Sequence, residues 1–234
     1  MCVVAVAWNA HPKWRLVAAG NRDEYHARES TPLDAWNDGS GIIAGRDLVS
    51  GGSWMGVSES GRFAVVTNIR DANGPDPAKL SRGALVADWL AQGRLPDDLD
   101  QFNPFNLIVT GSSSADYLSN RPAPLRQTLD SGIHGLSNAI PDEHWPRKDW
   151  MMRAMAAWLE TPSDHPEQLL DALCDEITPD RDAQPVFIRS PVYGTRCSTV
   201  IAVDHAGQGH IIERRFGADG SALGDVKAAF VWRG

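Results

Sequence analysis

The sequence predicts an α+β protein in which helices pack outside antiparallel β-sheets. Strand-like and helix-like segments come in blocks along the chain, in the order sheet, helix, sheet, helices, sheet. Such blocks favour this arrangement over a regular alternation around a parallel sheet. The 234 residues, 42% of them hydrophobic, suffice for one large core. We therefore expect a single domain over residues 1–234.

The opening block consists of strands and begins with a hairpin. Its first two segments are apolar and are separated by His11-Pro12-Lys13, and glycine-containing turns separate the later ones. Cys2 therefore lies at the head of the first expected strand. The strands expected in this block span residues 3–8, 14–19, 42–44, 54–57 and 63–69.

The first helix is expected at residues 84–90, with Ser81 as N-cap and Gly93 as the stop. Residues 71–77, rich in Asp, Asn, Gly and Pro, predict an exposed loop before it. Two later helices are expected at residues 150–159 and 167–177. The remaining strands are expected at residues 106–110, 117–119, around 125, 134–136, 186–188, 198–203, 210–212 and 229–232.

Composition narrows the classes of partner. The net charge of -8 and the lack of a Lys/Arg-rich run argue against nucleic acid, so a small-molecule ligand is expected. No apolar stretch approaches the roughly 20 residues of a membrane span, and no signal sequence is recognisable. We expect a cytoplasmic protein without stable membrane insertion. The nine tryptophans include candidates for lining a cavity for an apolar or flat ligand.

Neither a disulfide framework nor a metal site is expected. Three cysteines without tight spacing predict reduced thiols. The seven histidines show no metal-ligand spacing, although any one of them could ligate haem axially. No cofactor is required by these patterns, and haem is a candidate ligand only.

Cys2 directly follows Met1. Removal of Met1 would leave one residue with both a thiol and a free α-amine. Because the amine titrates at about 7.7–8.0 and a thiol at about 8.5, the amine can act as base for its own side chain. The ordinary alternative is a small apolar residue that opens a strand.

The second expected strand is followed, after Gly20, by Asn21-Arg22-Asp23-Glu24. If the strand continues, Arg22 and Glu24 face one side and Asn21 and Asp23 the other, so only part of the tetrad can point into one site. A carboxylate there would orient the amine of Cys2, and Arg22 would favour a thiolate or bind a ligand anion. A solvated hairpin end explains the same charges.

A set of short motifs is spread over most of the chain. They are Met1-Cys2, Asn21-Arg22-Asp23-Glu24, Gly45-Arg46-Asp47, Gly51-Gly52-Ser53-Trp54, Thr67-Asn68, Phe105-Asn106-Leu107, Gly135-Leu136-Ser137-Asn138 and Tyr193-Gly194-Thr195-Arg196. In these motifs the chain resembles the NRDE-motif family, whose animal members are called transport-and-Golgi-organisation proteins. That family is similar to the cysteine branch of N-terminal-nucleophile hydrolases. The resemblance implies a four-layer αββα sandwich of two antiparallel sheets flanked by helices.

The resemblance also assigns roles. In the hydrolase branch the first residue attacks an amide carbonyl and later asparagines hold the oxyanion, which implies these roles for Cys2, Asn68 and Asn138. Arg196 is similar to a late arginine near the nucleophile. The tetrad departs from the hydrolases, which carry arginine and aspartate where Asn21 and Glu24 stand here.

Two functions stay open. The first is a hydrolase in which Cys2 cleaves amide or thioester bonds. The second is a non-catalytic carrier of haem or acyl-CoA, in haem trafficking or lipid homeostasis, which the resemblance suggests. In a carrier Arg22, Arg46 and Arg196 would bind propionates or phosphates, and tryptophans such as Trp54 would cover the apolar part of the ligand.

Overall fold

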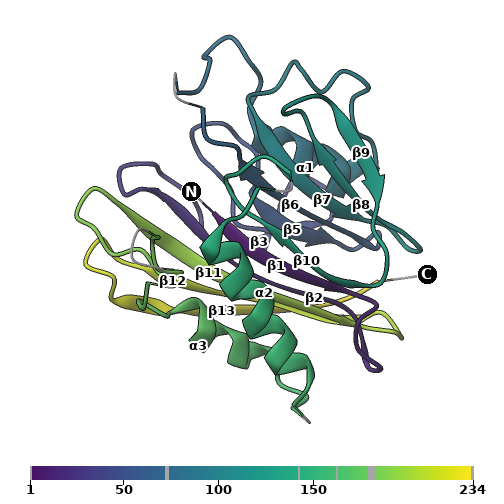
Figure 1. Ribbon diagram of the computed structural model, residues 1–234. Coiled ribbons are helices and arrows are strands. Elements are labelled where there is room, and N and C mark those ends of the chain that lie inside the picture. Colours follow the sequence, from purple (N-terminus) through teal and green to yellow (C-terminus); the bar gives the residue numbers. More distant parts are fainter. Residues whose placement is uncertain (1, 72–73, 142, 162, 179–182, 233–234) are drawn as a thin grey trace. The chain divides into compact units, whose positions relative to one another are not determined.

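The computed structural model describes residues 2–71, 74–141, 143–161, 163–178 and 183–232 (Figure 1). The chain divides into two compact units, each built around one antiparallel sheet. The first unit comprises Met1–Arg28, Ser131–Ser137 and His144–Phe230. The second comprises Glu29–Asp130, Asn138–Glu143 and Val231–Gly234.

The first unit holds a six-stranded sheet in the order β10-β1-β2-β11-β12-β13. Helices α2 (Pro146–Leu159) and α3 (Leu169–Leu173) lie along one face of it (Figure 1). Met151 and Leu170 of these helices pack with Ala5 and Ala19 of the sheet in a buried core. The strands are β1 (Val3–Trp8), β2 (Trp14–Tyr25), β10 (Gly132–Leu136), β11 (Tyr193–Asp204), β12 (Gln208–Phe216) and β13 (Ala222–Val231).

The second unit holds a seven-stranded sheet in sequence order, covered on one face by α1 (Arg82–Gln92). Both expected caps of α1 are confirmed. The Ser81 hydroxyl accepts a hydrogen bond from the amide of Gly83, and Gly93 ends the helix in the left-handed conformation. The strands are β3 (Asp34–Ala35), β4 (Ile42–Ala44), β5 (Met55–Ser58), β6 (Arg62–Asn68), β7 (Phe105–Thr110), β8 (Ala115–Ser119) and β9 (Leu125–Thr128).

The expected α+β fold of two antiparallel sheets flanked by helices is confirmed. The second strand is longer than expected, because β2 continues through the polar tetrad to Tyr25. The helix expected at residues 167–177 is shorter: a 3-10 turn, Pro166–Gln168, leads into α3, which ends at Leu173. Of the loop expected at residues 71–77, residues 72–73 lie outside the described part of the chain.

The strand expected at residues 186–188 does not form. Its backbone groups bond to several separate partners instead of forming a strand ladder. The amide of Phe187 donates to the carbonyl of Asp175, and the carbonyl of Ile188 accepts from the amide of Thr195. The carbonyl of Val186 accepts hydrogen bonds from Asn21 and Arg147, and the amide of Ile188 donates to the Thr195 hydroxyl. Apolar β-branched composition cannot distinguish such an anchored segment from a strand.

The Gly51-Gly52 pair marks a close backbone contact. A Cβ atom on Gly52 would lie 2.3 Å from the carbonyl carbon of Gly83 in α1, a distance that no side chain tolerates. The amide of Ser53 donates to the carbonyl of Gly83 at 3.2 Å. Glycine is therefore required where the chain leading into β5 meets the first turn of α1.

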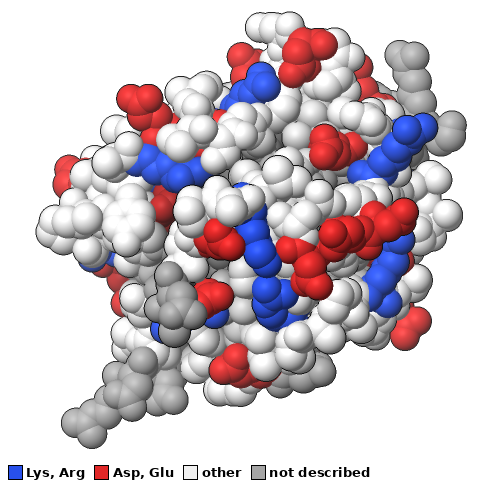
Figure 2. Space-filling model, turned by 90° about the horizontal axis from the view of Figure 1, so that it is seen from above, with Lys and Arg blue, Asp and Glu red and all other residues white. Residues whose placement is uncertain are grey.

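No helix in the described ranges is long and apolar enough to cross a membrane. On the face seen in Figure 2, acidic and basic side chains are interspersed among uncharged ones. The expectation that nucleic acid is not a partner stays a prediction.

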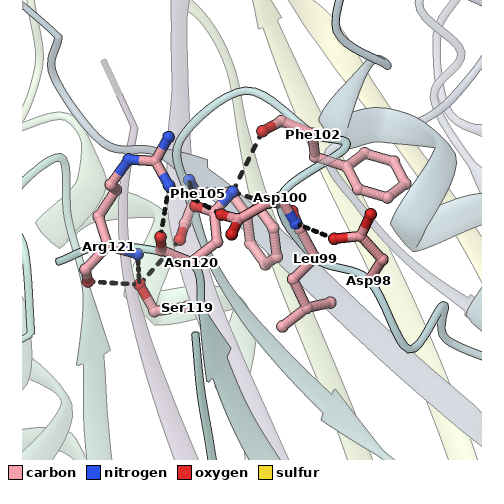
Figure 3. Close-up of polar contacts among 8 residues, drawn as sticks. All are labelled: Asp98, Leu99, Asp100, Phe102, Phe105, Ser119, Asn120 and Arg121. Carbon is pink, nitrogen blue, oxygen red and sulfur yellow. Dashed lines mark hydrogen bonds and ion pairs between the residues drawn. The ribbon is translucent and has the colours of Figure 1, made fainter. Parts of the chain in front are cut away.

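Asn120 anchors the segment that leads from α1 to β7 (Figure 3). Its side chain is fully buried and donates to the carbonyls of Leu99 and Phe102 at 3.0 and 3.1 Å. Its carbonyl oxygen accepts from the amide of Phe105 at 3.0 Å. One side chain thus binds three backbone groups between residue 99 and the first residue of β7.

We expect Asn120→Ala to lower the free energy of unfolding by about 2–4 kcal/mol, because it leaves buried backbone groups without partners. Urea denaturation followed by tryptophan fluorescence measures the change. Asn37→Ala is the matched control, since Asn37 is exposed and should tolerate the substitution. Equal stability of the two variants would contradict the anchoring role of Asn120.

Candidate functional site

Cys2 immediately precedes β1, at the level of Arg22 on the neighbouring strand. Val3 pairs with Asn21, so the antiparallel register sets Cys2 opposite Arg22. The residue is 9% exposed, and the backbone amide of Asp23 donates a hydrogen bond to its sulfur. Burial raises the pKa of the thiol, and the Asp23 carboxylate adds to this rise, whereas Arg22 opposes it. The thiol is therefore protonated at neutral pH.

The tetrad divides between the two faces of the sheet, as strand alternation requires. Asn21, fully buried, lies on the helix-covered face. Its amide nitrogen donates to the carbonyls of Leu173 and Val186 at 2.8 and 3.0 Å, and its oxygen accepts from the Ser198 hydroxyl at 2.6 Å. Asn21 thus joins β2 to the end of α3, to the 186–188 segment and to β11.

Asp23 shares that face and forms a buried ion pair with Arg147 of α2. The Nη2 atom of Arg147 lies 2.7 Å from one carboxylate oxygen, and both side chains are at most 2% exposed. The other carboxylate oxygen accepts from the Thr195 hydroxyl at 2.7 Å. Nε and Nη1 of Arg147 have no hydrogen-bond partner among the described residues, so Asp23 carries most of the compensation for this buried charge.

Arg22 and Glu24 alternate onto the opposite face of β2. Arg22 is 8% exposed and pairs across the strands with Cys197 of β11. Glu24 is partly exposed and accepts a hydrogen bond from the amide of Tyr25. Its second oxygen lies 3.9 Å from Arg28. Of the tetrad, Arg22 and Glu24 therefore share a face with Cys2, and Arg22 is the one directly opposite it.

A β-bulge places Arg196. Thr195 pairs with Asp23 and Cys197 with Arg22, which leaves Arg196 as an extra residue between two regular pairs. Its Nη1 atom donates to the carbonyl of His26 at 2.7 Å and lies 3.2 Å from the Nδ1 atom of the same histidine. Burial lowers the pKa of Arg196, and the nearby charges of Arg215 and Arg22 lower it further.

The second unit brings Asn68 and Asn138 into contact. The Asn138 side-chain amide donates to the backbone carbonyl of Asn68 at 2.6 Å. The carbonyl of Asn138 accepts from the amide of Arg70 at 2.9 Å. The oxygen of its side chain is buried and accepts no hydrogen bond from the described residues. The oxyanion roles of these two asparagines stay predictions.

Arg46 and Trp54 also belong to the second unit. Arg46 donates to the carbonyl of Gly51, lies 3.7 Å from Asp38 and covers the ring of Trp36 at 4.3 Å. Trp54 is 9% exposed, and its carbonyl accepts from the amide of Val66. The ligand-binding roles expected of both residues stay predictions.

The structure adds residues that the sequence patterns did not indicate. Arg147 is the buried partner of Asp23, and Cys197, Glu213 and Arg215 lie beside Arg22 and Arg196. No local spacing could have revealed Arg147, Glu213 and Arg215, because they come from a helix and a strand that are distant in sequence. Among the described residues, no group of three or more His, Cys, Asp or Glu is arranged to hold a metal ion.

Solved structures with this fold include an amidase and a hydrolase. The Caenorhabditis elegans ortholog of N-acylethanolamine-hydrolyzing acid amidase matches with a TM-score of 0.52 and 14% identity over 85% of this chain and 92% of that chain. Two variants of conjugated bile acid hydrolase from Clostridium perfringens each match with a TM-score of 0.51 and 8% identity, over 100% of this chain and 97% of that chain. The chain thus shares its fold with these solved structures.

Sequence comparison gives the family. The model for Transport and Golgi organisation 2 matches residues 1–218, and the chain belongs to this family. A Transport and Golgi organization protein 2 homolog from Bos taurus is 30% identical over 262 residues, and a homolog from Mus musculus is 29% identical over 256. Each alignment covers 92% of both chains. The resemblance noted from the sequence is confirmed.

The two acidic residues of the tetrad should differ in their effect on stability. Asp23→Ala should lower the free energy of unfolding by about 3–5 kcal/mol, because it leaves the buried charge of Arg147 without its carboxylate partner. Glu24→Ala, the matched control at a partly exposed site, should cost less than about 1 kcal/mol. Chemical denaturation measures both, and similar values would contradict the division of the tetrad between the faces.

The pKa of Cys2 can be tested through its alkylation. The rate of reaction with iodoacetamide should rise with pH through a midpoint above the ordinary thiol value, because only the thiolate reacts and burial raises the pKa. Arg22→Gln should move this midpoint further up, and Arg22→Lys should largely preserve it. Peptide-level mass spectrometry follows Cys2 separately from the other cysteines. A midpoint below the ordinary value would contradict this assignment.

Proposed function

We propose that the protein hydrolyses amide or thioester bonds, with Cys2 as the nucleophile after removal of Met1. The observation that carries the proposal is the position of Cys2 at the head of β1, opposite Arg22 and hydrogen-bonded through its sulfur to the amide of Asp23. Met1 itself lies outside the described residues. The neighbouring folds belong to proteins named as an acid amidase and a hydrolase, which supports this class of bond.

The chemistry follows from the thiol and the free α-amine that Cys2 carries once Met1 is removed. The α-amine takes the thiol proton, and the thiolate attacks the substrate carbonyl to form a tetrahedral oxyanion. When the C–N or C–S bond breaks, the leaving group takes the proton from the ammonium, and the acyl group stays on Cys2 as a thioester. Water then attacks this thioester, the C–S bond breaks, the acyl group leaves as a carboxylic acid, and the sulfur regains a proton as the thiol. The resemblance assigns stabilisation of the oxyanion to Asn68 and Asn138.

Arg22 has a defined part in this scheme. Its positive charge lowers the pKa of Cys2 against the larger effect of burial. Proton transfer to the amine and the charge of Arg22 therefore act in the same direction, since both favour the thiolate. Asp23, by contrast, is engaged with Arg147 and Thr195 on the other face. In this proposal it holds the strand in place and does not orient the amine through its side chain.

The second candidate is a carrier of acyl-CoA or haem. The raised pKa of Cys2 favours it, because a buried neutral thiol is a weak nucleophile. The departure of the tetrad from the hydrolase pattern favours it as well. In a carrier the arginines, among them Arg22, Arg46 and Arg196, would bind phosphate or propionate groups of the ligand.

Intact-mass spectrometry separates the two functions. The proposal predicts a chain that lacks Met1 and gains one acyl group during incubation with acyl-CoA or acyl-amide substrates. Cys2→Ala should abolish the adduct, whereas Cys174→Ala, at a partly buried thiol, should leave it unchanged.

A haem titration of the same preparation completes the test. Retained Met1, no acyl adduct and a shift of the Soret band on titration would overturn the hydrolase and establish the carrier. An adduct that depends on Cys174 would overturn the role of Cys2.

A further inference from the structure

Three arginine side chains gather around one row of the first sheet. Arg22 of β2 pairs with Cys197 of β11, and Cys197 pairs with Arg215 of β12. Directly opposed residues of adjacent strands project from the same face, with Cβ atoms roughly 4.5–5.5 Å apart. Arg22, Cys197 and Arg215 therefore share one face. Since Cys2 continues this row beyond Arg22, the nucleophile and two guanidinium groups are aligned across four strands.

Arg196 brings the third guanidinium group to this row. As the extra residue of the bulge, it has no cross-strand partner and lies between the Asp23–Thr195 and Arg22–Cys197 pairs. His26 fixes its orientation. The Nε2 atom of His26 lies 2.8 Å from the carbonyl of Ser190, so a proton on Nε2 leaves Nδ1 free to accept from Arg196. The Nε atom of Arg196 has no hydrogen-bond partner among the described residues.

Charges of both signs lie at this row. Glu213, 3% exposed, stands two residues before Arg215 on the same face, and their charged atoms lie 3.9 Å apart. Burial lowers the pKa of Arg196, and the positive charges of Arg215 and Arg22 lower it further, whereas the carboxylate of Glu24 opposes this shift. Arg196 is therefore repelled by both of the other arginines.

We infer that Arg22, Arg196 and Arg215 form a subsite for the anionic end of the ligand, a carboxylate or a phosphate, beside Cys2. Guanidinium groups bind such oxyanions with paired hydrogen bonds, and an anion among them relieves their mutual repulsion. Arg196 and Arg215 are only partly buried, so an anion can reach them. The inference rests on the proposed function only for Cys2 as the reacting group.

The substrate class follows from the position of the subsite. The acyl compound would carry a negative charge a short distance from the bond that is cleaved. A neutral amide with the same acyl chain would lose the guanidinium contacts. The subsite thus predicts selection by charge, in addition to whatever apolar contacts hold the acyl chain.

Binding to the Cys2→Ala protein tests the subsite without turnover. N-dodecanoylglycine and N-dodecanoylethanolamine share the acyl chain and the amide but differ in charge. Calorimetry should give at least about tenfold tighter binding of the glycine compound, the size expected for hydrogen bonds to a charged group. Arg215→Gln should remove most of this preference and Arg215→Lys should keep part of it. Arg126→Gln, at an exposed arginine of β9, is the matched control.

Glu213→Gln gives a result of opposite sign. It removes a negative charge from the cluster without changing its shape, so it should tighten binding of N-dodecanoylglycine severalfold and leave the neutral compound unaffected. Because one substitution is expected to weaken binding and the other to strengthen it, misfolding cannot produce both results. Equal affinities for the two compounds, or an Arg215→Gln protein that behaves like Arg126→Gln, would overturn the subsite.

Dodecanoyl-CoA distinguishes the two oxyanions. Tighter, Arg215-dependent binding of this thioester than of N-dodecanoylglycine assigns the subsite to phosphate, and the reverse order assigns it to carboxylate. The outcomes also separate this inference from the proposed hydrolysis. A charge preference without an acyl adduct on Cys2 sustains the subsite and overturns the hydrolase. An adduct formed equally from charged and neutral compounds sustains the hydrolase and overturns the subsite.

Discussion

The buried ion pair between Asp23 and Arg147 is the constraint on which the first unit depends. It ties the polar end of β2 to α2 where neither partner is accessible to water. Replacing the hydration of two charges requires close geometry and further hydrogen bonds. The Thr195 hydroxyl and the carbonyl of Val186 supply these contacts, so β11 and the 186–188 segment are held by the same pair.

This constraint sets the orientation of the whole tetrad. With Asp23 fixed toward the helices, alternation commits Asn21 to the same face and sends Arg22 and Glu24 to the other. Asn21 then satisfies backbone groups around the end of α3. The four consecutive polar residues thus act on two faces. Asn21 and Asp23 hold helices to the sheet, whereas Arg22 and Glu24 lie on the face of Cys2, with Arg22 directly opposite it. A contiguous motif in sequence is not one site in space.

The sequence predicted features that depend on neighbouring residues, but it could not predict contacts between segments that are distant along the chain. Ser81 and Gly93 delimit α1 because capping depends on a few neighbouring residues, and the first hairpin follows from alternation and its turn. The predicted split of the tetrad rests on the same local rule. Arg147 could not be matched to Asp23, since 124 residues separate them. The segment at 186–188 has strand-like composition, but its backbone groups bond to the side chains of Asn21 and Thr195 and to the backbone of Asp175 and Thr195.

The bulge in β11 makes the presence of Arg196 independent of the strand pairing around it. Because Arg196 is surplus to the ladder, Thr195 and Cys197 would pair with the same residues of β2 if it were missing. Loss of this single codon would thus remove one guanidinium group while every other side chain of the strand kept its face. This charge can therefore be gained or lost in evolution without a change in the pairing of β2 and β11, and a one-residue gap at this point would mark related chains that lack the guanidinium group of Arg196.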